Sequence, residues 1–101
     1  MGEYEQLKIK SKDGSIVFQK KLADYYLTKL KRPDDALEIY DRVLKIVPED
    51  LEALFAVAYI AESMEQFENA RVLYHRILEI EPGNKKADEK IDKLLRNENS
   101  G

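Results

Sequence analysis

Cysteine is absent from this 101-residue sequence, and its absence removes several classes of function at once. Without a thiol there is no disulfide framework, no cysteine nucleophile and no cysteine ligand for a metal ion. The sequence has one histidine, His75, and no glycine-rich loop of the kind that cradles phosphate groups. Arg71 and Arg76 lie close to His75 and are poor neighbours for a bound cation. We therefore expect an exposed histidine, no metal, no cofactor and no enzymatic activity.

Long apolar runs and blocks of one charge are also missing. No stretch approaches the ~20 apolar residues of a membrane-spanning helix, and residues 1–15 have no run typical of a secretory signal. The 17 Lys and Arg and the 20 Asp and Glu are spread along the chain, which gives a net charge of −3. The sequence therefore predicts one domain, a cytoplasmic location, no membrane insertion and no nucleic-acid partner.

The most apolar stretch begins at Leu51. Glu52 is the one residue from Leu51 to Ala61 that is not apolar. A helix that is apolar over most of its circumference is covered on several sides, so we expect the middle helix of an all-helical stack. At about 100° per residue its polar residues fall on one arc, and Phe55 and Tyr59 lie in that same arc. These two aromatic residues are candidates for a binding surface.

Prolines and turn residues divide the remaining chain into further helices. Pro33, Pro48 and Pro82 interrupt the apolar periodicity, because the residue before a proline is disfavoured in a helix. Ser15 is the expected N-cap of the first helix. The predicted elements are an N-terminal arm or partial cap at residues 1–15, helices at 16–32, 34–47, 50–64, 68–81 and 85–97, and a frayed tail at 98–101.

The N-terminal residues have a second interpretation. Leu7 and Ile9 alternate before the turn signal Asp13-Gly14, and Ile16 and Phe18 alternate after it, as they would in a β-hairpin. A lone hairpin is marginal in water, and the following residues are helical in pattern. We therefore favour an arm or a short helical turn.

The helical pattern repeats with a period of 34 residues. A shift of 34 positions aligns Tyr25 with Tyr59 and six further identical pairs: Ala36 with Ala70, Tyr40 with Tyr74, Arg42 with Arg76, Leu44 with Leu78, Ile46 with Ile80 and Pro48 with Pro82. The same shift pairs Ala53 with Ala87, so the last helix is the first half of a third copy. One unit is two helices, present about two and a half times.

A unit of this length and composition resembles the tetratricopeptide repeat. The residues that carry the resemblance are Ala36, Tyr40, Val43 and Pro48 in the first unit and Val57, Ala58, Ala70, Tyr74, Ile77 and Pro82 in the second. The resemblance covers about residues 17–96. Ala36 and Ala70 are small, which predicts a close helix crossing at each, and Tyr40 and Tyr74 are expected to fill the space beside the crossing. It implies an all-α fold of antiparallel helix-turn-helix repeats, stacked as a short right-handed α-solenoid of five main helices with a charged C-terminal capping helix at 85–97.

The sequence departs from the family pattern at four positions. Lys20 replaces a frequent tryptophan, and Asp24 replaces a small residue that lets helices approach closely. Lys31 and Glu65 stand where the turn between the two helices usually has glycine. These departures predict looser packing in the first unit.

The resemblance also implies a function. Proteins of this family are non-enzymatic interaction modules or scaffolds that bind a peptide or helix segment of a protein partner in a concave groove lined by the first helices. The groove residues predicted here are Phe18, Lys21, Tyr25, Thr28, Glu52, Phe55, Tyr59, Glu62, Lys86 and Lys93. Aromatic rings suit this task because they supply a large contact area at little entropic cost.

Three alternatives stay open. Tyr25 and Tyr59 could be structural filler, residues 1–9 could fold into the groove, or the exposed N-terminal repeat face could form a homo-oligomer as dimers or stacks. One subfamily clamps acidic C-terminal tails, and Lys21, Lys86 and Lys90 match three of its five positions. Tyr25 and Ala56 stand where that clamp has two asparagines. The two lost hydrogen bonds would each cost about 1 to 3 kcal/mol of binding free energy, which disfavours tail clamping.

Overall fold

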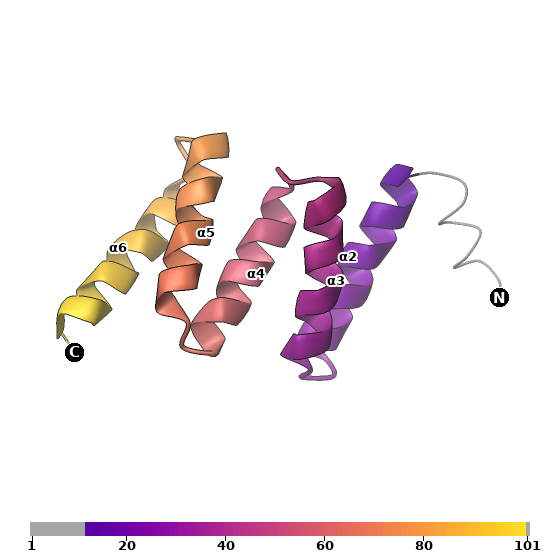
Figure 1. Cartoon of the computed structure of the whole chain (residues 1–101), viewed down its shortest axis with the longest axis horizontal. Helices are drawn as coiled ribbons and strands as arrows, with labels where there is room; N and C mark the ends of the chain where they lie inside the picture. Colours follow the sequence, from indigo (N-terminus) through magenta and orange to yellow (C-terminus); the bar gives the residue numbers. More distant parts are fainter. Residues whose placement is uncertain (1–11, 101) are drawn as a thin grey trace. The chain divides into compact units, whose positions relative to one another are not determined.

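A computed structural model of the chain describes the backbone of residues 12–100 and the side chains of residues 15–96. Within this range the chain forms five α-helices and no strand (Figure 1). The helices are α2 (Lys12–Thr28), α3 (Pro33–Ile46), α4 (Leu51–Ser63), α5 (Phe67–Ile80) and α6 (Lys85–Ser100). The prediction of an all-α fold is confirmed. The bounds of α3 and α5 differ by 34 residues at both ends, as the repeat requires.

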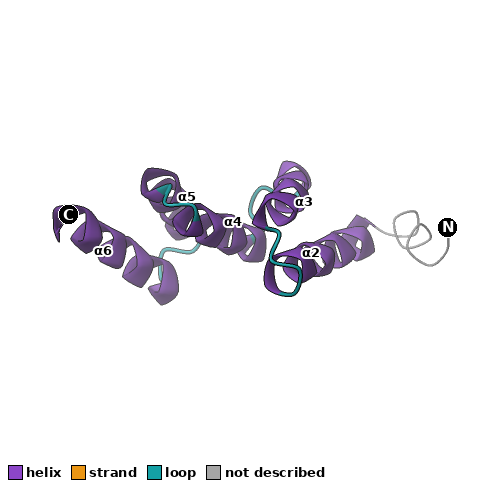
Figure 2. Ribbon diagram, turned by 90° about the horizontal axis from the view of Figure 1, so that it is seen from below, coloured by secondary structure: helices purple, strands orange, loops and turns teal. Residues whose placement is uncertain are grey.

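The helices form two compact units that divide after Pro48. Unit 1 contains α2 and α3, and unit 2 contains α4, α5 and α6. In unit 1 the two helices run antiparallel (Figure 1), pack against each other and are joined by a short loop at residues 29–32 (Figure 2). Ala23 of α2 and Ala36 of α3 are fully buried, and Tyr40 and Val43 fill the space beside them. The small residues permit the close helix approach expected from the sequence.

Unit 2 packs α5 against both α4 and α6. Every helix contributes an alanine with no exposed surface, and the larger side chains fill the space around these alanines. The buried residues are Ala53, Leu54, Ala58, Ile60 and Ala61 of α4, Ala70, Tyr74 and Ile77 of α5, and Ala87, Ile91 and Leu94 of α6. The burial of five residues of α4 accounts for the apolar composition of this helix.

Equivalent residues begin the first helix of successive repeats. The Asp50 Oδ1 atom accepts a hydrogen bond from the backbone N–H of Ala53 at 2.9 Å. The Asn84 Oδ1 atom accepts the equivalent bond from the N–H of Ala87, also at 2.9 Å. Each bond satisfies a helix N–H that has no partner within its own helix, which stabilises a helix by about 1 kcal/mol.

Equivalent residues also lie in the turns that follow α2 and α4. Lys31 and Glu65 have positive φ angles of 54° and 61°, in the left-handed region that favours glycine. After α4 the N–H of Gln66 donates to the carbonyl of Ala61 at 2.8 Å, and the N–H of Glu65 donates to the carbonyl of Glu62 at 2.9 Å. This pair of bonds defines a Schellman motif. The family's usual glycine position is therefore retained in backbone conformation although the residue has changed.

The first helix differs from the prediction at both ends. Helix α2 begins at Lys12, so Ser15 lies inside the helix and is not its N-cap. Asp13 and Gly14 are helical, so the β-hairpin alternative is wrong. One glycine costs a helix only about 1 kcal/mol, which the burial of nearby Ile16 offsets. The helix ends at Thr28 because Lys31 already has a left-handed backbone conformation, before the proline is reached.

The C-terminal helix is longer than predicted. Helix α6 continues to Ser100, where we expected a frayed tail from residue 98. Neither proline nor glycine occurs between Lys85 and Ser100 to end it. The predictions for the arm at residues 1–11, including the alternating Leu7 and Ile9, fall outside the described residues, as does Gly101.

Candidate functional site

Phe55 of α4 lies at the centre of a cluster that involves all three helices of unit 2. Its ring centroid is 6.1 Å from that of Tyr74 on α5, and the two planes are tilted by 54°. The Lys86 Nζ atom of α6 lies 4.9 Å from the centroid of the Phe55 ring, within the range of a cation–π interaction. Phe55 is half-buried as a result. The predicted site residues Phe55 and Lys86 are therefore in contact.

Tyr59 follows Phe55 by one helical turn and is more open. Its side chain is 54% exposed, which is far above the exposure of a core tyrosine such as Tyr74 at 1%. Residues at i and i+4 share one side of a helix, so Tyr59 extends the surface that begins at Phe55. The ring of Tyr59 is therefore accessible to a partner in unit 2.

Glu62 lies at the other end of this surface, away from Phe55. Its carboxylate accepts a hydrogen bond from the Tyr74 hydroxyl, and its Oε2 atom lies 3.7 Å from the Lys90 Nζ atom. One carboxylate thus joins α4, α5 and α6. The sequence suggested a ligand contact for Glu62, and the structure gives this side chain a role in holding the three helices together.

The electrostatics of Tyr74 follow from this arrangement. Burial raises the pKa of Tyr74 far above its ordinary value, and the hydrogen bond to Glu62 and the charge of Glu62 raise it further. The hydroxyl therefore stays protonated and remains a donor. The sequence identified Tyr74 as a packing residue, and its polar partner could not be foreseen because Glu62 is 12 residues away on another helix.

We call the surface formed by Phe55, Tyr59 and Glu62 of α4 with Lys86, Lys90 and Lys93 of α6 the unit 2 face. Its two halves are joined by the Lys86–Phe55 and Lys90–Glu62 contacts. Lys93 belongs to it because residues at i, i+4 and i+7 share a helix side with Lys86 and Lys90. Glu52 is exposed one turn before Phe55 on the same side of α4.

Unit 1 carries the remaining predicted groove residues, all on α2. Lys21, Tyr25 and Thr28 are exposed, with Tyr25 at 52%, and Phe18 is half-buried. The Thr28 hydroxyl donates to the backbone carbonyl of Asp24 at 2.8 Å, which engages its proton within the helix. That these four residues share one groove with α4 stays a prediction from the sequence.

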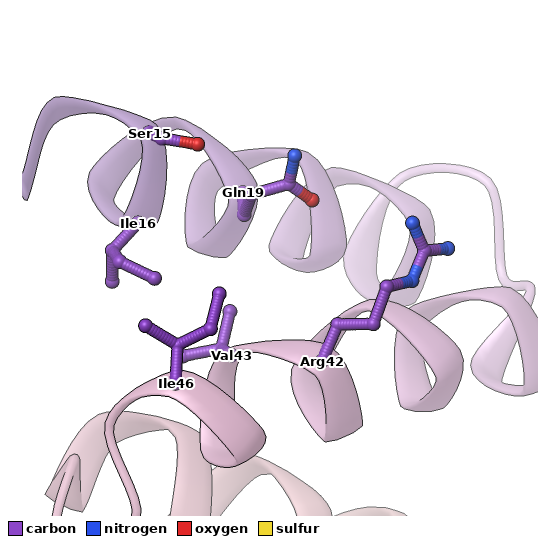
Figure 3. Close-up of a pocket in the computed structure, with 6 residues that line it drawn as sticks. All are labelled: Ser15, Ile16, Gln19, Arg42, Val43 and Ile46. Atoms are coloured by element: carbon purple, nitrogen blue, oxygen red, sulfur yellow. The ribbon is translucent and has the colours of Figure 1, made fainter. Parts of the chain in front are cut away.

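Unit 1 also has an open pocket of about 160 Å³ between the first turns of α2 and the last turns of α3 (Figure 3). Ser15, Ile16 and Gln19 line it from α2, and Arg42, Val43 and Ile46 line it from α3. The Arg42 guanidinium is 3.2 Å from the Glu38 carboxylate, so it has a partner already. The pocket has no acid, base or nucleophile arranged for chemistry.

The described side chains and helix lengths bear on metal binding and membrane insertion. Among the described residues, no group of three or more His, Cys, Asp or Glu side chains is placed to hold a metal ion. His75 is exposed, as predicted. No helix within residues 12–100 is both long and apolar enough to cross a membrane.

Comparison with known proteins supports the repeat assignment. The sequence profile of the tetratricopeptide repeat matches residues 27–88, which is more than half of the chain. The uncharacterized protein y4yS of Sinorhizobium fredii (strain NBRC 101917 / NGR234) is 41% identical over 54 residues. That match covers 54% of this chain and 30% of the relative, so the chain spans less than a third of the relative's length. The chain belongs to the tetratricopeptide repeat family, whose repeats are in general protein–protein interaction modules.

Proposed function

We propose that the unit 2 face binds a peptide or helix segment of a protein partner. The observation that carries this proposal is the half-exposed ring of Tyr59, which follows the half-buried ring of Phe55 along α4. An exposed aromatic residue beside a packed one offers a partner both new area and a rigid base.

Approximate free energies of burial and of ion pairing indicate which side chains of the unit 2 face contribute most to affinity. A buried aromatic side chain removes about 200 Å² from water, so covering the open half of Tyr59 buries about 100 Å² and contributes up to about 2.5 kcal/mol. An exposed ion pair to a lysine contributes about 0.2 to 1 kcal/mol. We therefore assign most of the affinity to Tyr59 and the orientation of the partner to the lysines.

Tyr59 is also the better residue to mutate. Phe55 contacts Tyr74 and Lys86, so its truncation would disturb the packing of unit 2 as well as binding. Tyr59 has no such constraint on its open half. A loss of binding in Tyr59→Ala can therefore be attributed to the surface.

The experiment begins with partners recovered on immobilised wild-type chain from an extract of the source cell. We expect Tyr59→Ala to weaken binding to a purified partner by about 1 kcal/mol or more, with unchanged helicity by circular dichroism. Val72→Ala is the matched control, since Val72 is 59% exposed on α5 and lies opposite Tyr74 on that helix. Equal binding by wild type and Tyr59→Ala would remove the proposal.

Self-association is the second candidate, and Ile46 favours it. This side chain is 48% exposed at the edge of the unit 1 pocket, where a second copy of the chain could cover it. A dimer that Ile46→Asp converts to a monomer in sedimentation velocity is the expected result for this function. A wild-type monomer at high concentration contradicts it.

A further inference from the structure

The turn after α2 and the turn after α4 are alike in backbone conformation but opposite in charge. We call residues 29–32 the unit 1 turn and residues 64–67 the unit 2 turn. Lys31 and Glu65 occupy equivalent positions in them, 34 residues apart, and both have positive φ angles. Glycine at either position would relieve this conformation. Each turn thus carries a charged side chain in spite of its conformational cost, positive in one turn and negative in the other.

Exposed apolar side chains lie beside these two charges. Leu30 precedes Lys31, Met64 precedes Glu65, and both apolar residues are exposed. Phe67 begins α5, and its exposed ring adds to the apolar surface of the unit 2 turn. Each turn therefore combines accessible apolar surface with an accessible charge, as the centre and the rim of a protein interface do.

The charges of Lys31 and Glu65 have no partner among the described side chains. Charged neighbours in and after the turns are already paired. Arg32 lies 2.6 Å from the carboxylate of Asp35, and Glu68 lies 2.7 Å from an arginine of its own helix. Lys31 and Glu65 are therefore available to a charged partner.

A second copy of this chain has the chemistry that fits both turns. It offers a carboxylate beside apolar side chains to the unit 1 turn, and an ammonium group beside an apolar side chain to the unit 2 turn. Complementary charges of this kind orient two surfaces and disfavour the pairing of like turns. A closed pair of copies uses the contact twice, and an open chain of copies uses it once between neighbours.

We infer that the chain self-associates through these turns, in a contact that pairs Lys31 of one copy with Glu65 of another. Leu30 of the first copy covers Met64 and Phe67 of the second, which removes apolar surface from water. The contact does not use the unit 2 face. It also differs from the self-association surface at Ile46, which lies at the opposite end of α3 from the unit 1 turn. The interface is small, so the expected association is weak and requires a high protein concentration.

Sedimentation equilibrium of the whole chain at low salt, at concentrations up to about 1 mM, tests the contact. The variants are Lys31→Glu, Glu65→Lys and an equimolar mixture of the two. Each variant alone should associate about 4- to 25-fold more weakly per contact than wild type, because an attractive pair becomes a repulsive one of similar size. In the mixture, one variant has a carboxylate at both positions and the other has an ammonium group at both. Every contact between them joins opposite charges, so association should recover.

The controls are Lys85→Glu and Asp41→Lys. They make the same changes of net charge at exposed residues outside both turns, and each should associate as wild type does. High salt should reduce the differences between the charge variants, since it screens exposed charges. Leu30→Gln should weaken association at low and at high salt, because it removes the apolar part of the contact. Circular dichroism checks that every variant keeps its helicity.

Three results would overturn the inference. The first is a wild-type chain that stays monomeric at about 1 mM. The second is a pair of single variants that fail to associate and fail again when mixed, with helicity unchanged. The third is an association that Ile46→Asp abolishes and the turn variants leave unchanged, which supports the surface at Ile46 instead. Peptide binding by the unit 2 face is tested separately by Tyr59→Ala, so failure of the turn contact leaves that proposal standing.

Discussion

Helices α2 and α4 are the first helices of successive repeats, but they are buried to different extents. Ala53, Leu54, Ala58, Ile60 and Ala61 of α4 are buried, whereas in α2 the buried residues among the described side chains are Ile16 and Ala23. The difference is largest at two equivalent pairs. Lys20 is half-buried where Leu54 is buried, and Asp24 is exposed where Ala58 is buried. A charged residue cannot occupy a fully buried site without a partner. Helix α2 is therefore buried on one side, whereas α4 is buried on several.

The two repeats are alike in the backbone conformation of their turns but differ in how deeply their side chains are buried. The turns of the two units share the left-handed conformation at Lys31 and Glu65, so this feature of the backbone is preserved. The depth of burial is not preserved, because it depends on the side chain at each contact position. Unit 2 therefore has the larger packed core and carries the proposed binding surface, and we expect it to be the more resistant to local unfolding.

The largest effect should come from exchanging residues between equivalent positions. Ala58→Asp places a carboxylate in the fully buried contact of α4, and we expect the free energy of unfolding to fall by more than about 3 kcal/mol. Asp24→Ala makes the reverse change on exposed α2, and we expect a gain of about 0.5 kcal/mol from helix propensity. Urea unfolding followed by circular dichroism measures both. Effects of similar size at the two positions would show that the units are packed alike.

The next effect should come from the hydroxyl of Tyr74 in unit 2. Tyr74→Phe removes the hydrogen bond to Glu62 while keeping the ring against Phe55, and we expect a loss of about 1 to 3 kcal/mol. Tyr59→Phe is the control, because Tyr59 is exposed and its ring is retained. If both variants unfold at the same urea concentration, the bond that joins α4 to α5 contributes nothing measurable.

The raised pKa of Tyr74 predicts that the free energy of unfolding depends on pH. Burial raises the pKa of Tyr74 above the value near 10 that an unfolded tyrosine has, so above about pH 10 the folded state binds more protons than the unfolded state. The contribution of Tyr74 is then fully present below pH 10 and is lost as the pH rises further. Urea unfolding at about pH 8 and about pH 11 should show a smaller loss of stability for Tyr74→Phe than for wild type. An identical loss would contradict the assignment.

The smallest effect should be common to both units. Lys31→Gly and Glu65→Gly relieve a side chain from a positive φ angle, and each should raise the free energy of unfolding by about 0.5 to 1 kcal/mol. The gain is reduced because glycine also adds freedom to the unfolded chain. Melting temperatures of the single and double variants would measure it. A gain in one unit alone would show that the two turns are not equivalent.

Much of the fold could be predicted from particular residues. The pairs Ala36 with Ala70 and Tyr40 with Tyr74 indicated the helix crossings, and all four side chains are buried as expected. Helix ends were predicted less well. Ser15 has the chemistry of an N-cap but lies inside α2, because packing of the neighbouring Ile16 extends the helix beyond the point at which local preferences would begin it.

Part of the candidate site could be predicted from the sequence. Phe55, Tyr59 and Lys86 belong to one surface in the structure, and the periodicity of the sequence had indicated the first two. The role of Glu62 could not be predicted, since its partners are Tyr74 on α5 and Lys90 on α6. A helical wheel shows which side of a helix a carboxylate occupies, but it does not show which groups of other helices reach it.

The sequence alone determined the repeat length, the all-α class and the family of this protein, because helical periodicity and the 34-residue spacing are local properties of the chain. The tertiary structure decided which polar side chains serve the fold and which remain available to a partner. Lys86, Lys90 and Lys93 are alike in sequence and share one side of α6, yet among the described residues Lys90 alone of the three has a carboxylate partner. The physical reason is that an ion pair depends on distances between helices, and those distances are fixed only when the core of unit 2 packs.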